Sequence, residues 1–153
     1  MPRVFIGIYV PEDFREKIAS LQEEMEKLPM KAKFVEKENL HISLSFLGEI
    51  TESNVEEISK KLDFISSQYK KFEVHITNLK LIPNQTYVRV IVLDVINSQL
   101  RKLSQHIKQE IGGDVKPPHL TLCRVKNIED KKTFFEKISQ LNTDIGSFVV
   151  DSI

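Results

Sequence analysis

The chain has 153 residues, of which 41% are hydrophobic, enough to form one domain with a buried core. Its 22 lysine and arginine residues balance its 22 aspartate and glutamate residues. That balance excludes a global positive field that would hold long nucleic acids without regard to sequence. A nucleic-acid ligand would have to be held locally, in a small pocket that accepts one nucleotide or one RNA end.

The first residues lack the charged, apolar and small-residue sections of a signal peptide, and no run of about 18 apolar residues predicts a membrane span. The single cysteine, Cys123, cannot form an internal disulfide, in agreement with a reducing compartment. We therefore expect a cytoplasmic protein that does not associate with membranes.

The first half of the chain predicts the order strand, helix, strand, helix, strand. The buried stripe of the first helix has spacings of four and three, and Pro29 ends this helix. Residues 78–85, which contain Pro83 and Asn84, predict a loop. The expected elements are strands over 4–10, 33–35, 40–47 and 72–76, a helix with the stripe Phe14, Ile18, Leu21, Met25 and Leu28, and a helix capped by Thr51 with the stripe Val55, Ile58, Leu62, Ile65 and Tyr69.

After this loop the same order of elements repeats. A helix capped by Ser98 is expected to stop at Gly112 and Gly113, and its stripe is again apolar. The other elements expected here are strands over 87–95, 119–125 and 148–153, and a helix from about Asp130 with Phe134, Phe135, Ile138 and Leu141.

The repeat predicts an α+β fold with two pseudo-symmetric lobes, about residues 1–83 and about residues 84–153, within a single domain. Each lobe would be an antiparallel sheet with helices on its outer face, and the two lobes would enclose a central cleft. His41 and His119 lie 78 residues apart, at the same place in each half. We expect their two strands to face each other across the cleft.

Each of these histidines leads a His-x-Ser/Thr motif on a strand. Side chains two residues apart in a strand project from the same face, so His41 is paired with Ser43 and His119 with Thr121. Strict alternation places Ser45 on the face of His41, and Phe46 on the core face with Leu40, Ile42 and Leu44. Together, the two motifs would form a pocket with two imidazoles and two hydroxyls.

This set of groups suits displacement at phosphorus. An imidazole is a base when neutral and an acid when protonated near neutral pH, so two imidazoles can serve the attacking and the departing oxygen. The hydroxyls can donate hydrogen bonds to the non-bridging oxygens of the phosphate. The histidines and the cysteine lack the close spacing of a zinc site, so we expect no metal and no cofactor.

A single histidine on a half-buried strand is most often a packed or solvated residue, and only the matched second motif favours catalysis. His75 and His106 lack such a match and are predicted to be solvated surface residues. Cys123 is in phase with His119 and Thr121, which could place it on the cleft floor, but a small buried residue is the commoner role for such a cysteine.

The motifs within residues 39–49 (NLHISLSFLGE) and 118–125 (PHLTLCRV) resemble the paired signatures of the two-histidine phosphoesterase superfamily. Within it, the chain is most similar to the archaeal and bacterial RNA 2′,3′-cyclic phosphodiesterases, also called 2′-5′ RNA ligases. The resemblance covers nearly the whole chain, and it implies the two-lobed fold with one motif contributed by each lobe. Members of this family continue past the strand that ends here at Ile153 with a further hairpin.

The resemblance implies opening of a terminal 2′,3′-cyclic phosphate of RNA to a 2′-phosphomonoester. It implies that His41 donates a proton to the departing 3′ oxygen and that His119 accepts one from water, although the residues alone leave this assignment open. Ser43 and Thr121 would bind the phosphate. Arg124 matches a basic residue that follows the second motif, but strict alternation puts it on the face opposite His119, so a bulge would have to redirect it.

Two alternatives remain open. A 2′-5′ RNA ligase acting on tRNA halves would use the same two histidines, with a 5′ hydroxyl in place of water. A nucleotide or RNA-end binding module would keep the pocket without turnover. The expected ligands are RNA ends, tRNA halves or small cyclic nucleotides, and we expect a monomer without a protein partner.

Overall fold

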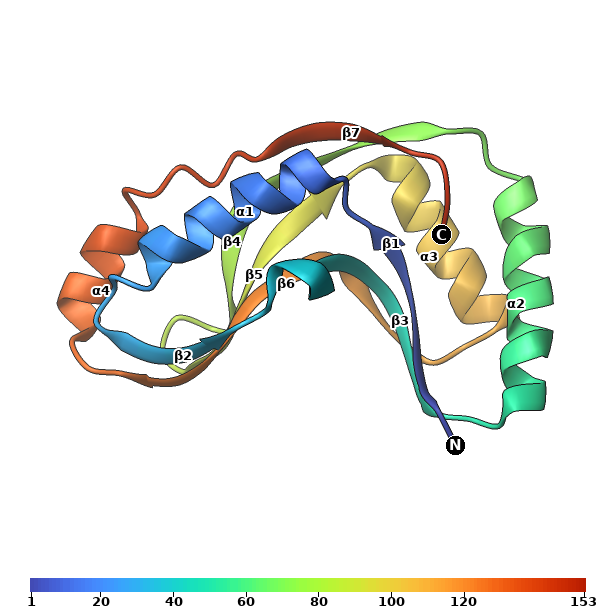
Figure 1. The fold of residues 1–153 in the computed structure, drawn as a ribbon, viewed down its shortest axis with the longest axis horizontal. Coiled ribbons are helices and arrows are strands. Elements are labelled where there is room, and N and C mark those ends of the chain that lie inside the picture. Colours follow the sequence, from blue (N-terminus) through green and yellow to red (C-terminus); the bar gives the residue numbers. More distant parts are fainter.

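The computed structural model describes residues 1–153. It has four α-helices and one antiparallel seven-stranded sheet, which confirms the predicted α+β class (Figure 1). The strand order is β1-β3-β6-β5-β4-β7, and β2 pairs with β6 off this path. The elements are β1 (Arg3–Tyr9), α1 (Glu12–Met25), β2 (Met30–Phe34), the 3-10 turn η1 (Lys37–Asn39), β3 (His41–Glu49), α2 (Glu52–Ser67), β4 (Phe72–Pro83), β5 (Val88–Ile96), α3 (Ser98–Glu110), β6 (Asp114–Ile128), α4 (Lys131–Ile138) and β7 (Gly146–Val150).

The sheet is strongly curved, and its helices gather in two places. In Figure 1, α2 and α3 lie together near β1 and β3, whereas α1 runs along β7 and α4 lies at the opposite end. The Phe14 ring of α1 packs against the Phe148 ring of β7, with 5.2 Å between the ring centroids.

The apolar periodicity predicted from the sequence corresponds to a single core of 28 buried side chains. The α1 stripe is buried through Phe14, Ile18, Leu21 and Met25. The α3 stripe is also buried. Thr51 caps α2, since its hydroxyl accepts a hydrogen bond from the Asn54 N–H at 3.2 Å. These features confirm the helical assignments. No helix is long and apolar enough to cross a membrane.

Pairing in the sheet crosses the middle of the sequence. β2, from the first half, pairs with β6 from the second half, and β4 pairs with β5 across residue 83. α1 likewise packs on β7 from the other end of the chain. The division of the chain into lobes near residue 83 stays a prediction, and the sheet itself is continuous through that point.

The loop predicted over residues 78–85 is wrong in most of its length, because β4 continues to Pro83. The ladder with β5 shifts by one residue at Asn78, which lies between the pairs Thr77–Asp94 and Leu79–Leu93. Asn78 has φ of 59°, a left-handed conformation that asparagine tolerates better than most residues. The chain absorbs the extra residue as a bulge and the strand goes on.

The predicted cap of α3 is also wrong by one residue. Asn97, not Ser98, is the N-cap, and its side-chain oxygen accepts hydrogen bonds from the N–H groups of Gln99 and Leu100. Asparagine and serine are comparable caps, so the residue types alone do not decide between neighbours.

Candidate active site

β3 and β6 are hydrogen-bonded neighbours in the sheet. Ser43 lies directly opposite His119, and Ile42 lies opposite Leu120. This differs from the expectation that the two strands face each other across a cleft. His41 is the diagonal neighbour of His119, a position that separates the two residues by about 7–8 Å. Two imidazoles at that spacing on one face of the sheet are able to bracket one phosphate.

A cleft of about 540 Å³ opens over this part of the sheet. All five residues singled out in the sequence line it, so the structure brings the two motifs and Arg124 together. The lining residues are Arg3, Phe5, Val35, His41, Ser43, Leu44, Ser45, Phe46, Asp114, Lys116, His119, Thr121 and Arg124.

Both histidines are held in the same way. The Nδ1 atom of His41 lies 2.7 Å from the carbonyl oxygen of Asn39, and that of His119 lies 2.9 Å from the carbonyl oxygen of Pro117. A carbonyl oxygen can only accept, so in both rings Nδ1 carries the hydrogen and donates it. Nε2 is left as the free nitrogen of each imidazole, available to accept a proton when the ring is neutral or to donate one when it is charged.

The backbone before each histidine supplies the carbonyl two residues earlier. Before His41 the carbonyl belongs to Asn39, the last residue of the turn η1. Before His119 the carbonyl belongs to a bulge in β6, since His119 lies four positions after Val115, whereas their partners Ser43 and Ser45 are only two positions apart. Pro117 and Pro118 lie in this bulge, where a residue without an N–H breaks no ladder.

Arg124 reaches the cleft because β6 bulges once more. Thr121 and Cys123 pair with the adjacent residues Val92 and Ile91 of β5, which leaves Leu122 as the extra residue. Thr121 and Cys123 therefore point to opposite faces, and Arg124 returns to the face of Thr121. The bulge required by the sequence reasoning is present, and Cys123 is fully buried rather than on the cleft floor.

Strand β3 departs from strict alternation, which overturns two predictions. Its register with β1 shifts between Ile6 and Gly7 and again between Val4 and Phe5. As a result, Phe46 is on the cleft face and 48% exposed, not in the core. Ser45 is buried, and its hydroxyl donates to the Gly112 carbonyl at 2.8 Å.

Phe5 is a cleft residue that the sequence reasoning missed. Its ring stacks on His41 with 4.3 Å between centroids and 30° between planes. Gly7 makes room for this arrangement, because a Cβ there would come within 2.7 Å of the Ile42 carbonyl oxygen and 3.0 Å of the Phe5 ring. The unexplained glycine inside an apolar strand was the available signal, since such a glycine often marks a close approach.

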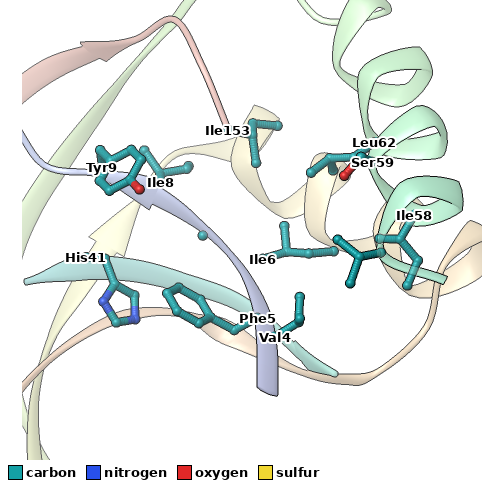
Figure 2. A pocket seen from close by; sticks show the side chains of 12 residues that line it. Val4, Phe5, Ile6, Ile8, Tyr9, His41, Ile58, Ser59, Leu62 and Ile153 are labelled. Carbon is teal, nitrogen blue, oxygen red and sulfur yellow. The ribbon is translucent and has the colours of Figure 1, made fainter. Parts of the chain in front are cut away.

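A second hollow, of about 340 Å³, lies behind His41 between β1 and α2 (Figure 2). Its walls are mostly apolar and include Ile58 and Leu62 of α2 and Ile153 near the end of the chain. His41 and Phe5 border both hollows, and Figure 2 shows their rings side by side. The apolar side chains of β1 and α2 thus form a wall on one side of the first histidine motif.

The remaining polar candidates lie outside the cleft. His75 is partly exposed and pairs with Asp144, as expected of a surface residue. His106 has the same intermediate exposure as His75, and its Nδ1 lies 3.3 Å from the Tyr69 hydroxyl. Burial raises the pKa of the Cys123 thiol to about 12, which keeps it protonated. No three His, Cys, Asp or Glu side chains come together to hold a metal ion.

Comparison with known proteins places the chain in a family. The model of the family described as LigT like phosphoesterase matches residues 8–92, which begin at the end of β1 and include the whole first histidine motif. The chain belongs to the LigT-like phosphoesterases. The resemblance found in the two motifs is therefore confirmed at the level of the family.

Two archaeal relatives of this phosphoesterase have the same name, RNA 2′,3′-cyclic phosphodiesterase. The protein of Methanocaldococcus jannaschii is 34% identical over 95% of this chain and 85% of its own length. That of Methanothermobacter thermautotrophicus is 30% identical over 99% of this chain and 86% of its own length. A crystal structure of E. coli LigT complexed with 3′-AMP has a TM-score of 0.67 at 22% identity, covering 97% of this chain and 82% of LigT. That similarity shows the fold.

Proposed function

We propose that this phosphoesterase hydrolyses the terminal 2′,3′-cyclic phosphate of RNA to a 2′-phosphomonoester, by acid–base catalysis with His41 and His119 and without a metal. The single observation that carries the proposal is the pair of imidazoles on one face of neighbouring strands, each with Nδ1 engaged by a carbonyl and Nε2 free. The names of the relatives supply the substrate class.

In the proposed reaction, a water molecule attacks the phosphorus and gives a proton to Nε2 of His119. The bond between phosphorus and the 3′ oxygen breaks, and His41 donates its proton to that oxygen. One water is consumed, and the product carries a 2′-phosphate and a 3′ hydroxyl. Each proton transfer by a positioned side chain contributes roughly 10² to 10⁴ in rate.

The other cleft residues stabilise the charge on the phosphate. The hydroxyls of Ser43 and Thr121 donate hydrogen bonds to the non-bridging oxygens, and the guanidinium of Arg124 adds a positive charge on the same face. The assignment of His41 as the acid follows the family resemblance. It is also supported by Phe5, since the face of an aromatic ring interacts favourably with a cation such as the imidazolium.

The test is turnover of a nucleoside 2′,3′-cyclic phosphate in the presence of EDTA, with the product identified by chromatography against 2′- and 3′-nucleotide standards. We expect the 2′-nucleotide alone. Binding of a nucleotide without any turnover would favour the binding module instead. A 2′-5′ linked product formed from RNA with a free 5′ hydroxyl would favour the ligase.

A further inference from the structure

Strand β2 presents two lysines beside the cleft that the catalytic reaction does not use. Side chains alternate along β2, and the backbone pairing continues to Val35, whose N–H donates to the Leu122 carbonyl, so Lys31, Lys33 and Val35 share one face. Val35 lines the cleft, and Lys33 lies directly opposite Arg124, which also lines it. Directly opposed residues in an antiparallel pair have their side chains on the same face, so Lys31 and Lys33 belong to the cleft face.

These three cations have no acidic partner. Lys31, Lys33 and Arg124 are exposed, and none of them takes part in an ion pair. Like charges opposite each other in a sheet are destabilising, so the pair formed by Lys33 and Arg124 costs stability unless an anion lies between them. We define Lys33 and Lys31 as the basic strip, which continues from Arg124 at the edge of the cleft.

The opposite side of the cleft is different. Lys116 pairs with Asp114 at 3.5 Å, and the Arg3 guanidinium lies 5.7 Å above the Phe46 ring. Apart from Arg3 on β1, the positive charge without an acidic partner therefore lies on the β2 side. Successive residues of the basic strip on β2 are about 6.6 Å apart along the strand, which is similar to the distance between neighbouring phosphates of a single RNA strand.

We propose that the basic strip binds the phosphates of the nucleotides that precede the cyclic end, so that an RNA strand several nucleotides long is a better substrate than a free cyclic mononucleotide. This inference rests on the proposed function, because it takes the cyclic phosphate to lie between the two histidines. It also agrees with the balanced charge of the chain, since only a local strip is available to hold a polyanion.

The experiment compares two substrates, a nucleoside 2′,3′-cyclic phosphate and a short oligoribonucleotide that ends in a 2′,3′-cyclic phosphate. The variants are the double substitution Lys31→Gln with Lys33→Gln and, as a matched control, Lys60→Gln with Lys102→Gln, which removes two exposed lysines from α2 and α3. For each protein, kcat/KM is measured at several salt concentrations.

For the wild type we expect a higher kcat/KM on the oligoribonucleotide and a steeper fall with salt. The β2 double variant should lose about tenfold on the oligoribonucleotide, mainly through KM, and its slope of log kcat/KM against log salt should be shallower by about 1.4, or 0.7 for each lost phosphate contact. Its activity on the mononucleotide, and both activities of the control, should stay unchanged.

An unchanged kcat/KM of the β2 double variant on the oligoribonucleotide would overturn the basic strip while leaving the proposed function intact. If the wild type hydrolyses neither substrate, the proposed function fails, and the strip is then tested by fluorescence anisotropy with a labelled oligoribonucleotide that ends in a 2′-phosphate. In that case, weaker binding by the β2 variant than by the control supports the strip, and equal binding overturns it.

Discussion

The two histidine motifs have the same local geometry in different surroundings. In each, the Nδ1 hydrogen is donated to the carbonyl two residues earlier. His41 lies next to the edge strand β1, stacks on Phe5 and has Tyr9 opposite it. His119 lies on the central strand β6, between Ser43 of β3 and Asp94 of β5, whose carboxylate pairs with Lys80 at 3.0 Å.

This comparison separates two requirements of such a site. The choice of ring nitrogen is made locally, by a backbone carbonyl, and is identical in both motifs. The surroundings of each ring come from distant parts of the chain, since the Phe5 ring stacks on His41, whereas Ser43 and Asp94 lie opposite His119 on the neighbouring strands. The two imidazoles thus leave the same ring nitrogen free but lie in different surroundings. This difference fits opposite roles as acid and base.

The largest effects are expected from the histidines themselves. His41→Ala and His119→Ala should each lower kcat on a 2′,3′-cyclic phosphate by roughly 10² to 10⁴, since each removes one proton transfer. Steady-state kinetics with EDTA present gives the measurement. His75→Ala, a change outside the cleft, is the matched control and should keep full activity; full activity in either cleft variant would contradict the mechanism.

The next largest effects are expected from the hydroxyls of Thr121 and Ser43. Thr121→Val and Ser43→Ala each remove one donor to the phosphate and should reduce kcat by about 10². Thr121→Ser keeps the hydroxyl and should retain most of the activity, in keeping with the serine that already occupies position 43. Equal loss in Thr121→Ser and Thr121→Val would mean that the methyl group matters and the hydroxyl does not.

Substitution of Phe5 tests the stacked ring that only the first motif has. An aromatic pair contributes about 0.5–1.5 kcal/mol beyond burial, so Phe5→Leu should lower kcat about two- to tenfold through the position of His41, with KM little changed. Phe5→Tyr keeps the ring and should restore the rate. Kinetics of Phe5→Leu in the His41→Ala background completes the cycle, and a further drop there would show that Phe5 acts independently of His41.

The smallest expected effect concerns Cys123, which contrasts with Thr121 two residues earlier. The raised pKa of its thiol, about 12, keeps it protonated well above neutral pH, and only the thiolate is nucleophilic. A thiol reagent at pH 8 should label the folded protein far more slowly than the urea-unfolded chain, without loss of activity. Rapid labelling that blocks turnover would place Cys123 in the cleft and contradict the bulge at Leu122.

The elements that depend on local periodicity were predictable from the sequence. The buried stripe of α1, the Thr51 cap and the two histidine motifs all follow from spacings within one element. Even the carbonyl partners of His41 and His119 lie only two residues away.

The features that depend on a partner strand were not predictable. One extra residue in β6 turns Arg124 toward the cleft and Cys123 away from it. Register shifts in β3 bring Phe46 to the cleft and bury Ser45. A bulge is defined by the pairing of two strands, so neither sequence segment contains it alone. The same holds for the adjacency of β3 and β6, which joins residues far apart in the chain.

The central claim is that both imidazoles act on one phosphate, and a crystal structure of the protein with a 2′-nucleotide tests it most directly. The account predicts that the phosphate lies between the two rings, with oxygens about 3 Å from Nε2 of His41 and of His119 and within hydrogen-bond reach of the Ser43 and Thr121 hydroxyls. A phosphate that contacts only one of the two histidines, or binds outside the cleft, would contradict it.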